Sequence, residues 1–110
     1  MDNNVKNTVK LGEQVLTFNL YDAETAAAYE QALVVLREEK LQAETLSELV
    51  TAEVGSVRKF LDTLFGDGTA WAVLGGRDDL NAALDCVEAV TKAAAEQGEA
   101  MRQRVAAYRR

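Results

Sequence analysis

The residues with the most chemical potential in this chain are two carboxylate pairs, Asp78 with Asp79 and Asp62 with Asp67. Paired carboxylates act as general acid and base only where a cleft shifts their pKa values, and nothing in the sequence indicates such a cleft. A helix cap and a solvated loop explain both pairs. The chain has no His and a single Cys, which excludes imidazole bases and disulfides within the chain. We therefore expect no enzymatic activity.

A glycine-rich stretch, residues 66–79, is the second candidate because it holds four of the seven glycines. A phosphate-binding loop of the ATPase type needs a Lys after its glycines, and this stretch has none. In a dinucleotide fingerprint starting at Gly66 the third glycine would stand at Trp71. A calcium loop starting at Asp67 would need an oxygen ligand at the same position. We therefore expect no cofactor and no metal.

The single cysteine, Cys86, lies in a helical pattern with Leu84, Val87 and Val90. No Lys or Arg stands three or four residues away to lower its pKa. The thiol is therefore expected to be a small buried hydrophobic group rather than a nucleophile.

Two strand-like segments, residues 8–11 and 15–20, flank Gly12 and Glu13 and predict an N-terminal β-hairpin. The alternation in the second segment predicts that one apolar face packs onto helices or onto another chain. Because the outer strand edges of a lone hairpin are unpaired, a homo-oligomer is one expected arrangement.

Three helices follow from the pattern of caps, and the last of them is expected to be capped by Asp78 or Asp79. Asp22 predicts the N-cap of a helix that starts at Ala23, and Thr45 with Glu48 predicts a capping box for a helix that starts at Leu46. No Gly or Pro separates the two, so whether they are continuous stays open, with a break near Gln42 and Glu44 as one alternative.

In the glycine-rich stretch, Gly66 is expected to end the second helix in the left-handed conformation. Thr69 is expected to cap a short helical turn over residues 70–74, which Gly75 ends. Trp71 in this turn has two interpretations: a plug of the hydrophobic core, or an anchor for a partner protein, since Trp is enriched at the centres of interfaces.

The C-terminal helix, residues 80–110, carries a stripe at heptad spacing, which predicts near-antiparallel packing against the preceding long helix or against another subunit. The stripe consists of Leu80, Leu84, Val87, Thr91, Ala94, Gly98, Met101, Val105 and Tyr108. Because the middle of the stripe is small, the distal half of the helix is expected to be less stable unless a partner covers it.

The expected fold class is mainly α: an N-terminal β-hairpin followed by an antiparallel bundle of two to three long helices, with a short helix in the glycine-rich connection. The 110 residues are enough for one domain. Its expected parts are the hairpin segment 1–21, the helices of 22–65, the glycine-rich loop 66–79 and the long helix 80–110.

Charge is distributed unevenly around a net value of −6, which disfavours binding to nucleic acid. Residues 13–99 hold 17 acidic and 6 basic residues, whereas residues 100–110 hold four Arg and no acid. This basic tip either complements the negative end of the helix macrodipole or docks an acidic partner. No segment has the roughly 20 apolar residues needed to cross a membrane, and the N-terminus lacks the layout of a signal peptide. A cytoplasmic location and no membrane partner are therefore expected.

Three short runs, residues 60–69, 73–76 and 78–81, resemble the signature of the small tail assembly chaperones of long-tailed phages and prophages of Gram-positive bacteria. The order of an N-terminal strand-like segment, a helix and a long C-terminal helix is similar to that family. The chain departs from the pattern at Trp71 and Ala72, where polar or basic residues are expected.

The resemblance implies a non-enzymatic protein of the host cytoplasm that binds the tape measure protein and recruits subunits of the tail tube, the major tail protein. The residues that it places at the partner contact are Phe65, Gly66, Gly68, Thr69, Trp71, Leu74, Gly75, Gly76, Arg102 and Arg109. Two alternatives stay open: a secreted helical-hairpin protein with a Trp-x-Gly turn, and another small helical adaptor.

Overall fold

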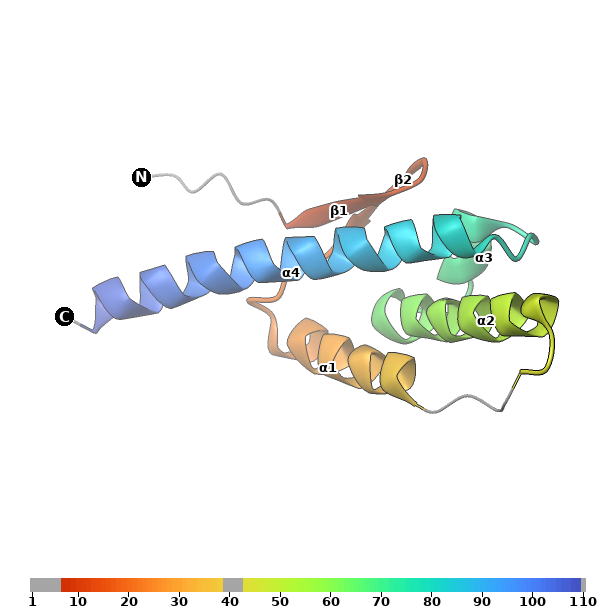
Figure 1. The fold of residues 1–110 in the computed structure, drawn as a ribbon. Coiled ribbons are helices and arrows are strands. Elements are labelled where there is room, and N and C mark those ends of the chain that lie inside the picture. Colours follow the sequence, from red (N-terminus) through yellow and green to blue (C-terminus); the bar gives the residue numbers. More distant parts are fainter. Residues whose placement is uncertain (1–6, 39–42, 110) are drawn as a thin grey trace.

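The structure is a computed structural model that describes residues 7–38 and 43–109. Its elements are β1 (Thr8–Leu11), β2 (Gln14–Thr17), α1 (Ala23–Arg37), α2 (Leu46–Phe65), α3 (Thr69–Leu74) and α4 (Leu80–Tyr108). The hairpin lies on one side of α4, α2 packs against another side, and α1 packs along α2 (Figure 1). The mainly α fold class, with its N-terminal β-hairpin and short helix in the glycine-rich connection, is confirmed.

β1 and β2 form the predicted antiparallel hairpin, in which Leu11 pairs with Gln14 across a two-residue turn. The turn begins at Gly12, whose φ of 60° glycine adopts without strain. β2 ends at Thr17, earlier than predicted, because the chain turns at Phe18 and buries its ring in the core. The hairpin is thereby fixed to the helices rather than standing alone.

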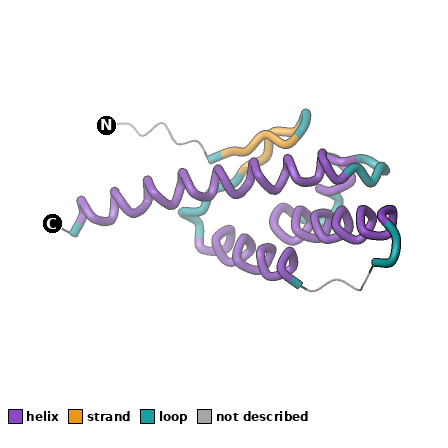
Figure 2. The backbone as a smooth tube through the Cα atoms, in the orientation of Figure 1, coloured by secondary structure: helices purple, strands orange, loops and turns teal. Residues whose placement is uncertain are grey.

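α1 and α2 are separate helices that lie antiparallel to each other (Figure 2). The Asp22 carboxylate accepts a hydrogen bond from an N–H in the first turn of α1 at 3.0 Å, and Thr45 Oγ1 accepts from the N–H of Glu48 at 3.1 Å. Both predicted N-caps are confirmed, but the Glu48 carboxylate accepts the N–H of Glu44 at 2.9 Å rather than that of Thr45, so the capping box differs from the predicted one. Glu38 is extended, so the first helix does not run on into the second. Of the two residues near which a break was the alternative, Gln42 lies outside the described residues and Glu44 is not helical.

The junction between α2 and α3 differs from two predictions. Gly66 ends α2 with φ 113° and ψ 157°, so it is not in the left-handed helical conformation. Thr69 is the first residue of α3 and Gly68 stands at the cap position. The reason lies in tertiary structure: Asp62 Oδ1 accepts the N–H of Ala70 at 2.9 Å. A side chain of α2 therefore supplies the cap that Thr69 was expected to provide.

α4 runs in the same direction as α2 and opposite to α1 (Figures 1 and 2). Arg58, within α2, donates to the carbonyl of Gly75 just before α4 begins. Phe65, at the end of α2, packs edge-to-face on Phe18, whose carbonyl accepts a hydrogen bond from Gln97 far along α4. The expected near-antiparallel packing of the C-terminal helix on the second long helix is therefore wrong. The cause is that α3 and the glycine loop carry the chain back along α2 before α4 starts.

The buried face of α4 also differs from the predicted heptad stripe. Its buried residues are Ala83, Cys86, Val90, Ala94 and Gln97. Only Ala94 belongs to the stripe, and Leu84 is 46% exposed. A heptad stripe presumes a single partner helix, whereas α4 packs against both β1 and α2. The buried face therefore lies between the directions of these two neighbours.

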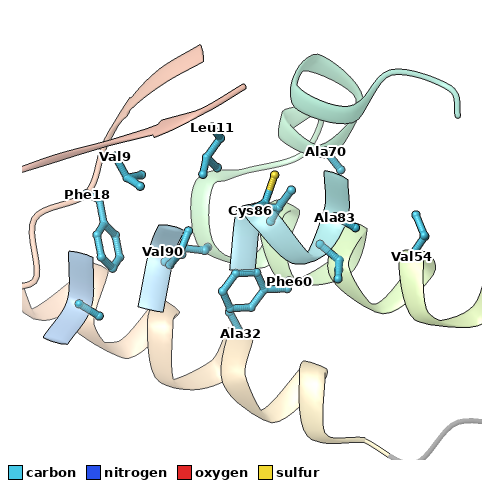
Figure 3. Close-up of a cluster of buried hydrophobic side chains, with 14 residues drawn as sticks. Val9, Leu11, Phe18, Ala32, Val54, Phe60, Ala70, Ala83, Cys86 and Val90 are labelled. Atoms are coloured by element: carbon cyan, nitrogen blue, oxygen red, sulfur yellow. The ribbon is translucent and has the colours of Figure 1, made fainter. Parts of the chain in front are cut away.

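The hydrophobic core lies where the hairpin, α2 and α4 meet (Figure 3). Phe18, Phe60 and Leu61 are fully buried. Small residues such as Ala32 and Ala83 are also fully buried, which lets the backbones approach closely around these few large side chains.

Candidate protein-binding site

Trp71, in the short helix α3, is 68% exposed. The interpretation of this residue as a plug of the core is therefore wrong. Its neighbour Ala70 is buried, and consecutive residues of a helix point about 100° apart. Burial of Ala70 therefore turns the indole outward. The large aromatic side chains that are fully buried in the core are those of Phe18 and Phe60.

Side chains and backbone of two helices hold the start of α3 in place. Asp62 Oδ1 accepts the N–H of Ala70, and Thr69 Oγ1 donates to the carbonyl of Gly66 at 2.8 Å. Helix starts have N–H groups without intrahelical partners, and a carboxylate near them is also favoured by the helix dipole. Of the predicted carboxylate pair Asp62 and Asp67, Asp62 therefore has a structural role, as a cap supplied from α2.

Arg58 fixes the other end of α3 and the loop after it. Its Nη2 donates to the carbonyls of Gly75 at 2.7 Å and Arg77 at 2.8 Å, and its Nε lies 3.5 Å from Asp78 Oδ1. The side chain is only 23% exposed, so water screens these contacts less than at an open surface. Sequence reasoning missed Arg58, because the carbonyls that it binds are 17 and 19 residues away and leave no local signal.

The two residues of the second carboxylate pair, Asp78 and Asp79, have different contacts, one with Arg58 and one with the start of α4. Asp79 Oδ1 accepts the N–H groups of Asn81 and Ala82 at 3.0 and 3.3 Å, which confirms the predicted helix cap. Asp78 faces Arg58. Neither arrangement is a paired-carboxylate site.

Gly76 permits the position of the indole ring. A Cβ atom at this residue would lie 3.1 Å from Cη2 and 3.2 Å from Cζ3 of Trp71, which is closer than ordinary van der Waals contact. The ring therefore lies against the backbone of the loop, and the loop is held by Arg58. An exposed Trp restrained in this way loses little conformational entropy on binding.

The other predicted contact residues lie in two separate regions. Gly66, Gly68 and Gly76 are exposed, and Thr69, Leu74 and Gly75 are partly buried around α3. Phe65 is partly buried, and its ring packs on that of Phe18 with centroids 6.1 Å apart.

Arg102 and Arg109 are exposed near the C-terminal end of α4. About 33 Å of helix separates Leu80 from Arg102. The structure therefore brings the residues of 65–76 together and leaves the two arginines apart from them.

A hollow of about 190 Å³ opens between the hairpin turn, α3 and α4. Its lining includes Leu11, Gly12, Leu74 and Cys86. Burial raises the pKa of the Cys86 thiol, and the charge of Asp85 raises it further. The predicted burial of Cys86 is confirmed, and the hollow, which Lys10 and Asp85 also line, does not hold an activated thiolate.

The described residues, 7–38 and 43–109, contain neither a cluster of metal-ligating side chains nor a helix that could span a membrane. No three or more Cys, Asp and Glu side chains among them are grouped as metal ligands would be. Within the same ranges, no helix is long and apolar enough to cross a membrane.

The chain belongs to a family of unknown function, DUF6673, whose profile matches residues 7–110. Comparisons with curated proteins and with solved structures gave no match.

Proposed function

We propose that this chain is a non-enzymatic tail assembly chaperone, which binds the tape measure protein and recruits tail-tube subunits in the cytoplasm of a phage host. The observation that carries a protein-binding role is the exposure of Trp71, restrained by Gly76 and Arg58. The resemblance of residues 60–69, 73–76 and 78–81 to tail assembly chaperones supports the choice of partner.

The chemistry of the partner supports the same choice. A tape measure is a very long helical chain, and an uncovered apolar stripe on it would aggregate. A rigid Trp on a small domain is the type of residue that dominates the binding energy of an interface. Shielding such a stripe requires a binding surface and no catalytic site.

The alternative of a secreted helical-hairpin protein with a Trp-x-Gly turn is less well supported. Such a hairpin needs the two helices beside the Trp to run in opposite directions, whereas α2 and α4 run in the same direction (Figure 1). A Trp-x-Gly turn would also need a glycine at position 73, whereas the next glycine after Trp71 is Gly75. Localisation in culture supernatants distinguishes this alternative from the proposal.

We expect Trp71→Ala to abolish capture of the tape measure without unfolding the chain. Co-expression of the two proteins and affinity purification should recover a stoichiometric complex with the wild type, and about tenfold less or none with the variant. Because the indole is mostly exposed, thermal unfolding should stay within about 2 °C of the wild type.

A matched control is Leu46→Ala, which removes another exposed large apolar side chain, 76% exposed, at the start of α2. It should leave capture intact. Retained capture by Trp71→Ala would contradict the proposed site. A tape measure that stays soluble and assembles without this protein would contradict the proposed function.

A further inference from the structure

The last two turns of α4 carry an apolar strip that the chain itself leaves uncovered. We call Met101, Val105 and Tyr108 the C-terminal strip. Val105 is 44% and Tyr108 is 87% exposed, and Met101 is partly buried. On a helix, residues at these spacings share one face. The end of α4 extends past α1 and the hairpin (Figure 1), so the strip is open along one side.

The C-terminal strip continues the buried face of α4. Ala94 and Gln97 are buried, and Met101 and Tyr108 follow them in the same helical direction. The strip is thus the part of an otherwise packed face that reaches beyond the body of the molecule. Where the helix leaves the body, Tyr21 is 39% exposed, and the Arg104 guanidinium lies 5.4 Å from the centre of its ring.

Charge around the strip is mostly positive. Arg102, Arg104 and Arg109 flank it and are exposed, and residues 100–110 contain no acid. Glu96 and Glu99 precede the strip on the same helix, and Glu99 pairs with Arg102.

These properties select the occupant. A narrow strip along a helix is complementary to the ridge of another helix, and arginines on its flanks favour carboxylates on the partner. Two copies of the strip placed face to face would instead bring their arginines together.

We infer that the C-terminal strip binds an amphipathic helix whose apolar stripe is flanked by Asp and Glu. This inference rests on the exposure and charge of the strip and not on Trp71 or on the tail-assembly function, although Arg102 and Arg109 also belong to the predicted partner contact.

The test is fluorescence anisotropy of the full chain with a labelled synthetic helix of about 20 residues, or about 30 Å. The probe has Leu on one face and Glu on the flanks, and a control probe has Lys in place of each Glu. The Glu probe should bind, the Lys probe should bind at least about tenfold more weakly, and added salt should weaken the binding of the Glu probe.

Variants locate the contact. Val105→Ser and Tyr108→Ser should each weaken binding of the Glu probe about tenfold. Leu84→Ser, on the same helix and similarly exposed at 46%, should leave it unchanged. Combined Arg102→Glu and Arg109→Glu should transfer binding from the Glu probe to the Lys probe. Melting curves of each variant should match the wild type, since the altered side chains are exposed.

Equal affinity for the two probes, no binding of either probe, or an equal loss in Leu84→Ser would overturn the inference. Sedimentation velocity tests the remaining possibility, that a second copy of the chain binds the strip. A dimer that Val105→Ser dissociates would show that a second copy covers the strip, and this outcome would also overturn the acidic-helix partner.

Discussion

Gly76 leaves room for the indole ring of Trp71, which lies against the backbone at this residue. The sequence predicted two interpretations of the Trp, and the structure excludes the core plug because the indole is 68% exposed. Residue type alone cannot decide between these interpretations, since Trp is common in cores and in interfaces. The difference of one helical position between Ala70 and Trp71 decides it.

Gly76→Ala should displace the indole while the fold is retained. The added Cβ would lie 3.1 Å from Cη2 of Trp71, and an exposed ring can move away at little cost. We expect a change of stability of at most about 0.5 kcal/mol, together with a shift of Trp emission and weaker capture of the partner. Trp71 is the single Trp of the chain, so fluorescence reports on this ring alone.

The control is Gly55→Ala, where the added Cβ meets nothing within 4 Å. Within α2 this change should stabilise the chain by up to about 1 kcal/mol and leave the emission unchanged. Identical spectra for Gly76→Ala and the wild type would show that Gly76 does not position the ring.

At the scale of elements, α3 depends on side chains of α2 rather than on its own sequence. Asp62 caps its start and Arg58 holds the loop after its end. A helix of six residues is too short to be stable by itself. The presence and the orientation of α3 are therefore consequences of α2. The prediction of Thr69 as the cap used local residues only, whereas the cap comes from Asp62 and Gly68 stands at the cap position.

Asp62→Ala should destabilise the chain by about 1 kcal/mol, because the N–H of Ala70 loses its acceptor. Asp62→Asn keeps an acceptor oxygen and should recover most of this loss. Urea denaturation measures both free energies of unfolding, and hydrogen exchange of the Ala70 amide should accelerate in the Ala variant alone. Equal stability of the Ala and Asn variants would contradict the capping role.

At the scale of the whole molecule, Gln97 connects the two ends of the sequence. Its Oε1 accepts the N–H of Leu20 at 2.7 Å and its Nε2 donates to the carbonyl of Phe18 at 2.6 Å. The residue is fully buried. It satisfies two backbone groups of the segment that joins the hairpin to α1, so it fixes the hairpin and α1 relative to α4.

Gln97→Ala should cost about 2–4 kcal/mol, because it leaves the partly buried N–H of Leu20 and the buried carbonyl of Phe18 without this partner. Gln103→Ala, at an exposed position of the same helix, should change stability by at most about 0.5 kcal/mol. Urea midpoints compare the two variants. Equal midpoints would show that Gln97 does not hold the fold together.

The sequence by itself determined the features that depend on neighbours a few residues apart. The hairpin turn at Gly12, the caps at Asp22 and Thr45, a cap at Asp78 or Asp79, and the end of α3 at Gly75 all follow from short-range hydrogen bonds and backbone preferences. These signals are local because capping residues bond to groups within the first turn.

Only the tertiary structure decided the direction and buried face of α4, the exposure of Trp71, and the roles of Arg58 and Gln97. The hydrogen-bond partners of Arg58 and Gln97 lie 17 to 79 residues away in the chain, so no local pattern in the sequence indicates them. Helical periodicity shows that a helix has an apolar face. Which neighbours cover that face, and from which side, depends on how the remaining elements pack.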